Sequence, residues 1–267
     1  MTERHIAIVL AGGRGSRMNS DIPKQYMQIM GKPVLYYSLL CFQNSFIDDI
    51  ILVCGESDID YCQKEIVDRY GLDKVRFIVA GGQERYNSVY NGICIAEKLL
   101  YGEVSAVMCG VNSIGKEVTS AKKNKQGYIY IHDGARACVN EMVLEECRKN
   151  VILYKACIPS VSVKDTIKIA DDSGFVKATP ARKQLMAVQT PQTFEYELVK
   201  TAYDRLYSDL ATGKCNKDIT DDAMVVEEYT DTKIKFCQGN YENIKITTPE
   251  DMDTAEKNIK KMCLKPL

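Results

Sequence analysis

The 267-residue sequence has no long apolar run and no excess of charge of either sign. Its longest apolar stretches, at residues 6–11 and 50–54, fall far short of the roughly 20 residues that a bilayer-spanning helix needs. No leader-like segment opens the chain. The 35 basic and 36 acidic residues give a net charge of −1, so no long-range field would hold a nucleic acid. We therefore expect a soluble, cytoplasmic protein that partners neither nucleic acid nor membrane.

Histidine is scarce, and the cysteines do not form motifs. His5 and His132 are the only imidazoles, and none of the 11 cysteines belongs to a C-x-x-C pair. These counts argue against a zinc knuckle and a small disulfide scaffold. Nothing in the sequence resembles a Ser–His–Asp triad. We expect most of the cysteines to be small apolar core residues in a reducing compartment.

Two common nucleotide-binding motifs are also missing. The P-loop pattern G-x-x-x-x-G-K-[ST] does not occur. A dinucleotide fingerprint would need Gly or Ala where Met18 stands, and an acidic residue about 20 positions later at the end of a strand. The second predicted strand ends only at Cys54. A hydride-transferring Rossmann enzyme is therefore disfavoured.

Short buried strands alternate with helical stretches in the first half of the chain. The runs are too short and too apolar for surface helices, so they predict strands at residues 5–10, 50–54, 75–80 and 128–132. Helical spacing of apolar residues predicts helices at 34–42, with Pro33 at the first helical position, and at 59–70 and 88–100. This alternation predicts an α/β fold of three layers, α/β/α, around a mainly parallel sheet.

Two segments break the alternation. Residues 102–127 are rich in Gly, Ser and Lys and predict a surface insertion with at most one short strand. Residues 161–193 have hairpin character and predict an arm that another surface must cover. The second half is then predicted to hold helices at 195–210, from Thr220 and at 249–262, with a strand at 233–237. We expect one domain, residues 1–267, that carries both segments.

A glycine-rich stretch follows the first strand. Gly12, Gly13 and Gly15 would let backbone N–H groups approach a phosphate chain, and Arg17 and Lys24 would meet its charge. The alternative is an ordinary glycine-rich turn between a strand and a helix. A second glycine turn, at residues 81–88, occupies the same position after another strand. Two such turns at one sheet edge suit a nucleotide, although Gly81 and Gly82 alone would also fit a plain turn.

An acidic residue ends the strand at 128–132. Asp133 at the carboxyl end of a strand, close to Arg136, suits a magnesium ion that keeps phosphate and water ligands. Asp133 could equally cap the next turn, and His132 is better interpreted as a packed residue than as a base.

Eight ordered blocks together resemble one enzyme family. They are AGGRGSRM, PKQY, GGQERYNSV, HDGAR, VKDTIK, VQTPQTF, TDDA and NIKITTPED, spread from about residue 6 to 259. In this order they resemble the 2-C-methyl-D-erythritol 4-phosphate cytidylyltransferases, which join CTP to a sugar-alcohol phosphate with Mg²⁺ and release pyrophosphate. The resemblance implies a Rossmann-like fold of the nucleotide-diphospho-sugar transferase type.

The resemblance also assigns roles by block. The CTP site would contain Ala11, Gly12, Gly13, Gly15, Arg17, Lys24, Gly82 and Ser88. Asp133 would bind the metal, and the methylerythritol phosphate would be held by Asp133, Arg136, Thr166, Arg182, Thr190, Thr220 and Lys245. Catalysis would fall to the cations Arg17, Lys24, Arg182 and Lys245. In this family the arm crosses to a second subunit, so a homodimer is implied in which Thr166 and Arg182 serve the partner's site.

Two departures and two alternatives accompany the resemblance. The family usually has Pro where this chain has Ala137, and it lacks the insertion of about 25 residues at 102–127, which lies near enough to the metal-binding edge to act as a lid. The first alternative is a ribitol-5-phosphate cytidylyltransferase of the same fold. The second is a catalytically silent nucleotide-binding protein. Such a protein would be expected to lose its charged ligands, but all five predicted cations are present: Arg17, Lys24, Arg136, Arg182 and Lys245.

Overall fold

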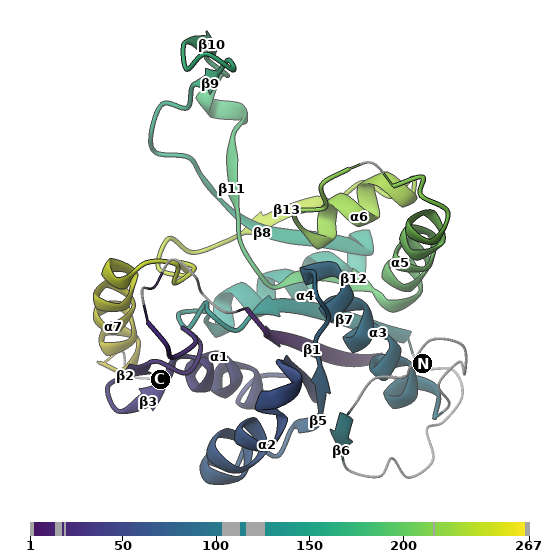
Figure 1. Ribbon diagram of the computed structural model, residues 1–267, viewed down its shortest axis with the longest axis vertical. Helices are drawn as coiled ribbons and strands as arrows, with labels where there is room; N and C mark the ends of the chain where they lie inside the picture. The colour runs from purple at the N-terminus through teal and green to yellow at the C-terminus, as the bar shows by residue number, and fades with distance from the viewer. Residues whose placement is uncertain are drawn as a thin grey trace.

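A nine-stranded sheet forms the centre of the computed structural model, which describes residues 3–13, 18, 20–102, 113–115, 126–215 and 217–264 (Figure 1). The strand order is β11-β8-β12-β7-β1-β4-β5-β6, and β13 pairs with β8. The strands of this sheet are β1 (Glu3–Ala11), β4 (Asp49–Cys54), β5 (Val75–Ala80), β6 (Ser113–Gly115), β7 (Gln126–Asp133), β8 (Ala156–Ser162), β11 (Met186–Val188), β12 (Gln192–Glu195) and β13 (Lys235–Gln238). Two short pairs stand apart, β2 (Gln28–Ile29) with β3 (Lys32–Pro33) and β9 (Ile169–Ala170) with β10 (Val176–Ala178).

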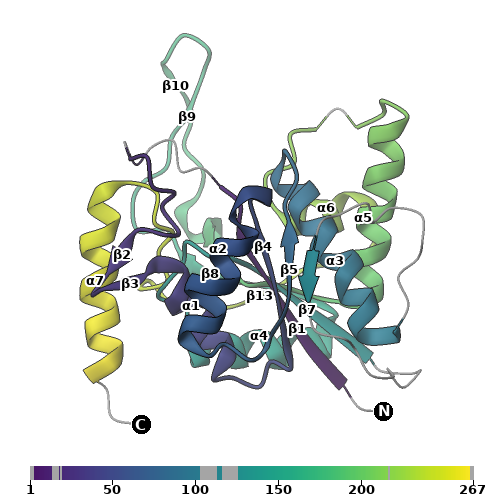
Figure 2. The ribbon, with the colours of Figure 1, turned by 60° about the horizontal axis from the view of Figure 1, so that its bottom comes forward.

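Helices cover both faces of the sheet, which confirms the predicted three layers (Figure 2). The helices are α1 (Val34–Gln43), α2 (Ile59–Tyr61), α3 (Arg85–Tyr101), α4 (Glu141–Tyr154), α5 (Tyr196–Ala211), α6 (Asp222–Tyr229) and α7 (Pro249–Leu264). One core lies between the sheet and α1 and α4, and a second lies between the sheet and α3, α5 and α6. A third, smaller cluster packs α7 against Ile29 of β2 and Val34 of α1. Among the described residues, no helix combines the length and apolarity that a membrane crossing requires.

The middle of the sheet is parallel. β1 pairs in parallel with β4 and β7, and β4 pairs in parallel with β5, whereas β6, β11 and β12 run antiparallel to their neighbours. All six residues of β4 are buried, as expected for a strand covered on both faces. The parallel arrangement brings the carboxyl ends of β1, β4, β5 and β7 to one edge, which is where the functional side chains gather.

Three predicted helix starts differ in detail. Pro33 is the N-cap of α1 rather than its first residue. The segment predicted as one helix at 59–70 consists of α2 followed by a π-helical stretch (Cys62–Asp68), and a 3₁₀ turn (Glu56–Asp58) precedes it. The short helix begins at Asp222 instead of Thr220, because the Asp221 carboxylate accepts the backbone N–H of Met224 and so caps α6.

α4 and most of β8 lie between residues 132 and 161, where no element was predicted. The Asn140 side chain accepts the N–H of Val143 at 3.1 Å and caps α4. Val143, Cys147 and Val151 recur at helical spacing and are fully buried. Both signals were available in the sequence.

The arm leaves the sheet between β8 and β11 and carries β9 and β10 (Figure 1). Both ends of the range 161–193 remain in the main sheet, because residues 161–162 belong to β8 and residues 192–193 to β12. The projecting part exposes Ile169, Phe175 and Val176. Most of the insertion at 102–127 lies outside the described residues, although β6 within it pairs antiparallel with β5.

Candidate active site

A pocket opens where β1, β5 and β7 end. Six of the residues predicted to hold CTP line it, although they come from segments far apart in the chain: Ala11, Gly12, Gly13, Lys24, Gly82 and Ser88. Asp133 and Lys245, which were predicted to hold the sugar phosphate, line it as well. The structure therefore brings together the first glycine stretch, the second glycine turn, the strand-end aspartate and the lysine near the last helix, as expected at the carboxyl edge of parallel strands.

Both glycine turns contribute residues to the pocket and to a second hollow. This hollow shares Gly12, Gly13 and Gly82 with the pocket and extends to Gly55 and Gly81. The Gly82 N–H donates to the Ser88 hydroxyl at 3.1 Å, and a Cβ built on Gly82 would stand 2.3 Å from the Cβ of Asn87. Only glycine fits this close approach.

A side-chain hydrogen bond fixes the start of the first glycine turn. The Gln25 amide donates to the Ala11 carbonyl at 2.7 Å, which fixes the end of β1 where the turn begins. Gln25 is buried and was not among the predicted site residues. Gly15 and Arg17, which the sequence assigned to the phosphates of CTP, lie outside the described residues.

Three cations surround the Asp133 carboxylate. Lys245 Nζ lies 3.0 Å from Asp133 Oδ2, Arg136 Nε lies 3.6 Å from the same oxygen, and Arg85 Nε lies 3.6 Å from Oδ1. Burial alone would raise the pKa of Asp133, but the charges of Arg85, Lys245 and Arg136 outweigh it and hold that pKa well below its usual range. Asp133 is therefore ionised throughout the neutral range, and the surrounding charge is net positive.

Arg85 was missed by the sequence analysis. It lines the pocket and makes a two-pronged ion pair with Asp222, with Nη1 to Oδ1 at 2.8 Å and Nη2 to Oδ2 at 2.7 Å. The Tyr203 hydroxyl donates to the same carboxylate at 2.6 Å. Arg85 therefore links the second glycine turn and Asp133 to the start of α6. Its place in the block GGQERYNSV was the available signal, but the partner Asp222 lies 137 residues away.

His132 and Thr190 form a hydrogen-bonded chain that ends at the backbone N–H of Asp133. Burial lowers the pKa of His132 to about 4, so the ring is neutral. Its Nε2 lies 3.3 Å from the Arg136 carbonyl, which makes Nε2–H the donor, and Nδ1 then accepts from the Thr190 hydroxyl at 2.9 Å. Thr190 Oγ1 in turn accepts the Asp133 N–H at 3.1 Å. In the described structure Thr190 is a buried positioning residue, and it does not line the pocket.

Residues 243–246 form a short segment, here called the strap, whose backbone carbonyls accept hydrogen bonds from two cationic side chains. Lys24 Nζ donates to the Ile246 carbonyl at 2.8 Å, and Arg136 Nη1 donates to the Asn243 carbonyl at 2.8 Å. The buried Arg136 Nε has no hydrogen-bond partner among the described residues. Lys245 projects from the same strap to Asp133. Lys24, Arg136 and Lys245 thus all contact or belong to this one strap.

Three predicted residues lie away from the pocket. Thr166 and Arg182 are exposed on the arm, where Arg182 Nη1 donates to the Lys164 carbonyl at 3.1 Å. Thr220 is exposed just before α6 and contacts Met224 Sδ at 3.8 Å. None of the three lines the pocket of this single chain.

An enzyme that brings two phosphate-bearing anions together needs a backbone cradle for one and excess positive charge for both. This fold provides the two features side by side at the end of a parallel sheet, and together they define a nucleotidyltransferase.

Comparison with known proteins makes the assignment specific. The sequence model of the family described as 2-C-methyl-D-erythritol 4-phosphate cytidylyltransferase matches residues 5–101 and 97–261. The chain belongs to this family, and it is a cytidylyltransferase. The ribitol-5-phosphate alternative is thereby disfavoured.

Individual relatives agree over nearly the whole chain. The enzyme of this description from Lachnospira eligens is 44% identical over 250 residues, which cover 93% of this chain and 96% of the relative. The crystal structure of 4-diphosphocytidyl-2C-methyl-D-erythritol synthase from Anaerococcus prevotii matches with a TM-score of 0.73 and 29% identity, covering 97% of this chain and 96% of that one. The corresponding Francisella tularensis structure has a TM-score of 0.66 and 26% identity, covering 96% and 100%.

Proposed function

We propose that the pocket binds CTP and 2-C-methyl-D-erythritol 4-phosphate and joins them into 4-diphosphocytidyl-2-C-methyl-D-erythritol with release of pyrophosphate. Membership of the family supports this reaction. The observation that carries the proposal is the cluster of three cations around Asp133, beside the glycine turns that would hold the nucleotide.

In this reaction a phosphate oxygen of the sugar alcohol attacks the α-phosphorus of CTP, in line with the departing pyrophosphate. The O–P bond to the acceptor forms as the bond to the β-phosphate bridge breaks. An ionised phosphate needs no general base, and the neutral, buried His132 is not placed to act as one. Lys24, Lys245 and Arg136, with Arg17, would lower the repulsion between the two anions and stabilise charge on the leaving group.

Asp133 is the proposed metal ligand. Mg²⁺ in such sites takes one or two carboxylates and completes its shell with phosphate oxygens and water, which a single strand-end carboxylate fits. The ion would neutralise charge on the triphosphate. Lys245, now 3.0 Å from Oδ2, would have to give up part of this contact, and it would then be available to the phosphates.

The arm is proposed to exchange between the subunits of a homodimer. Thr166 and Arg182 are exposed and remote from their own pocket, and the neighbouring Phe175 and Val176 are 73% and 63% exposed. Large apolar side chains on a narrow projection are the kind of surface that a partner covers. In this arrangement each chain acts as a single cytidylyltransferase domain, residues 1–267, that lends its arm to the other. We also propose a cytoplasmic enzyme, in keeping with the free thiols of the described cysteines.

The deciding experiment measures pyrophosphate release from CTP with purified protein. Release that requires Mg²⁺ and methylerythritol phosphate, with ribitol 5-phosphate a poor acceptor, is the expected result. Equal rates with the two acceptors would overturn the substrate assignment, and CTP binding by calorimetry without turnover would overturn the catalytic one.

A further inference from the structure

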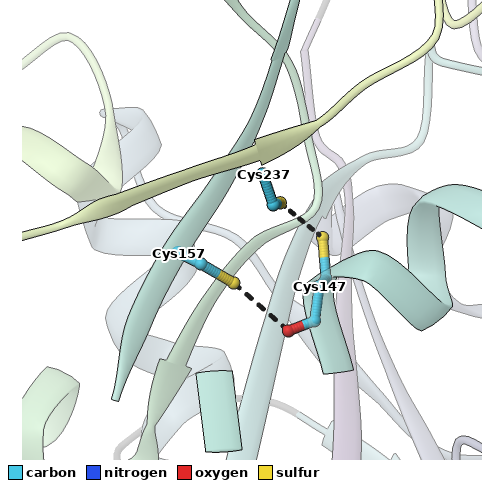
Figure 3. Close-up of side chains that lie close together, drawn as sticks. All are labelled: Cys147, Cys157 and Cys237. Carbon is cyan, nitrogen blue, oxygen red and sulfur yellow. Dashed lines mark hydrogen bonds between the residues drawn. The ribbon is translucent and has the colours of Figure 1, made fainter. Parts of the chain in front are cut away.

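Three buried thiols from three different elements lie close together (Figure 3). Cys147 belongs to α4, Cys157 to β8 and Cys237 to β13. Their sulfur atoms all lie within 4.8 Å of one another. Cys147 and Cys157 are fully buried, and Cys237 is 7% exposed. The predicted role of the cysteines as core residues holds for most of those described, but it does not account for this convergence.

The spacing of the sulfurs suits metal coordination. Cys147 Sγ and Cys237 Sγ are 3.7 Å apart. Two thiolates bound to one zinc ion at about 2.3 Å with tetrahedral angles lie roughly 3.8 Å apart. Parallel pairing of β13 with β8 places Cys237 opposite Pro159, two residues beyond Cys157, so the two cysteines lie diagonally on one face of the sheet. The third sulfur comes from the helix that packs on this face.

Hydrogen bonds connect the three cysteines. Cys147 Sγ lies within hydrogen-bond distance of Cys237 Sγ, and the Cys157 thiol donates to the Cys147 carbonyl at 3.2 Å (Figure 3). Burial raises the pKa of Cys147, and hydrogen bonding within the cluster raises the pKa of Cys157 and lowers that of Cys237. Of the three thiols, Cys237 therefore gives up its proton most readily to an entering cation.

Cys237 is also the one member of this cluster with any exposure, at 7%. Cys237 lines a hollow together with Ser160, Gly239 and Met142. This hollow gives a route for an ion and an open side for a fourth ligand such as water. The three converging ligand atoms are all sulfur, which favours soft cations over Mg²⁺ or Ca²⁺.

We propose that Cys147, Cys157 and Cys237 form a binding site for one soft divalent cation of the Zn²⁺ class. The cation binds all three sulfurs, whose protons leave to solvent, so three thiolates around a divalent ion carry a net charge of −1. A bound ion links α4, β8 and β13. The site is separate from Asp133, which offers oxygen ligands and is surrounded by cations.

The test uses the reduced, metal-free full-length protein with excess Mg²⁺ present to occupy oxygen sites. Cd²⁺ is titrated and the ultraviolet thiolate-to-cadmium absorption is followed, with Zn²⁺ measured by competition against a chromogenic chelator. We expect one ion per chain for the wild type and for the matched control Cys138→Ser, which removes a buried thiol outside the cluster. Cys237→Ser should weaken binding by at least ~100-fold.

Binding should also weaken as the pH falls, because protons compete for the same sulfurs. X-ray absorption of the Zn²⁺-loaded wild type should give three sulfur neighbours, and it does not depend on any variant folding. The proposal is overturned if the wild type binds no Cd²⁺ or Zn²⁺ at micromolar concentration, if Cys237→Ser binds as tightly as Cys138→Ser, or if the zinc neighbours are nitrogen and oxygen only.

Discussion

The ammonium group of Lys245 lies 3.0 Å from the Asp133 carboxylate, although the two residues are 112 positions apart in the chain (245 − 133). Arg136 and Arg85 approach the same carboxylate at 3.6 Å. One negative charge thus holds several positive charges in place before any substrate is bound. Such preorganisation avoids the cost of gathering the cations during the reaction.

Replacing Asp133 by asparagine tests this charge balance through stability. Because the pKa of Asp133 is held below its usual range, the carboxylate stabilises the fold above about pH 4, and this contribution is lost as the pH falls through the lowered pKa. The wild type should therefore be more stable than Asp133→Asn by a constant amount from about pH 8 to pH 5, and the difference should shrink below about pH 4. Urea denaturation at each pH measures it, with exposed Asp172→Asn as control. A difference that widened in acid would contradict the assignment.

Lys24→Ala should mainly affect turnover. Lys24 lines the pocket and is oriented by the Ile246 carbonyl at 2.8 Å, where it would meet the triphosphate. Loss of one preorganised charge should lower kcat by ~10²–10³ with a smaller change in the KM for CTP. Steady-state pyrophosphate release gives both constants. Lys149→Ala, on the exposed surface of α4, is the control, and a near-normal kcat for Lys24→Ala would refute the role.

The arm exchange predicts complementation between two defective chains. Arg182→Ala alone should raise the KM for the sugar phosphate, and Asp133→Ala should be inactive. When the two are denatured and refolded together, random pairing should restore about one quarter of the wild-type sites, because half of the dimers are mixed and each mixed dimer has one intact site. Mixtures no more active than the Arg182→Ala chains they contain would mean that each chain builds its own site.

Arg85→Ala should destabilise the protein. It leaves the Asp222 carboxylate, which is fully buried, without its ionic partner. We expect a loss of about 3 kcal/mol in the free energy of unfolding, at the low end for a buried pair because Arg85 itself reaches solvent. Addition of Asp222→Asn should recover part of the loss.

The control for that measurement is Arg69→Ala, which removes the exposed pair with Glu65 and should cost less than about 0.5 kcal/mol. If Arg85→Ala and Arg69→Ala lowered the free energy of unfolding equally in chemical denaturation, the ion pair with Asp222 would contribute no more to stability than an exposed pair.

Local patterns were enough to predict the parallel strands and the glycine turns. The apolar runs of β1 and β5 are short and rich in β-branched residues, which favours strands buried on both faces, and glycines directly after a strand indicate the edge where ligands bind. These are properties of neighbouring residues, so a single sequence displays them.

Long-range partners were not predictable in the same way. The pairing of Arg85 with Asp222 depends on how α6 folds back over α3 and α5, which no local pattern specifies. Thr190 was assigned to the substrate, whereas its hydroxyl is occupied by His132 and the Asp133 backbone. The roles of Thr166 and Arg182 depend on a second chain, and a single chain leaves them as predictions.

The buried, uncharged imidazole behind Asp133 has a consequence for how the enzyme responds to acidity. With the pKa of His132 near 4 and that of Asp133 lower still, neither group changes its ionisation between pH 5 and 8. A phosphate monoester takes up its second proton near pH 6. The acid limb of a rate profile would then come from the phosphates of the two substrates, and an acceptor analogue with a differently acidic phosphonate would move the acceptor's share of it while the protein stayed unchanged.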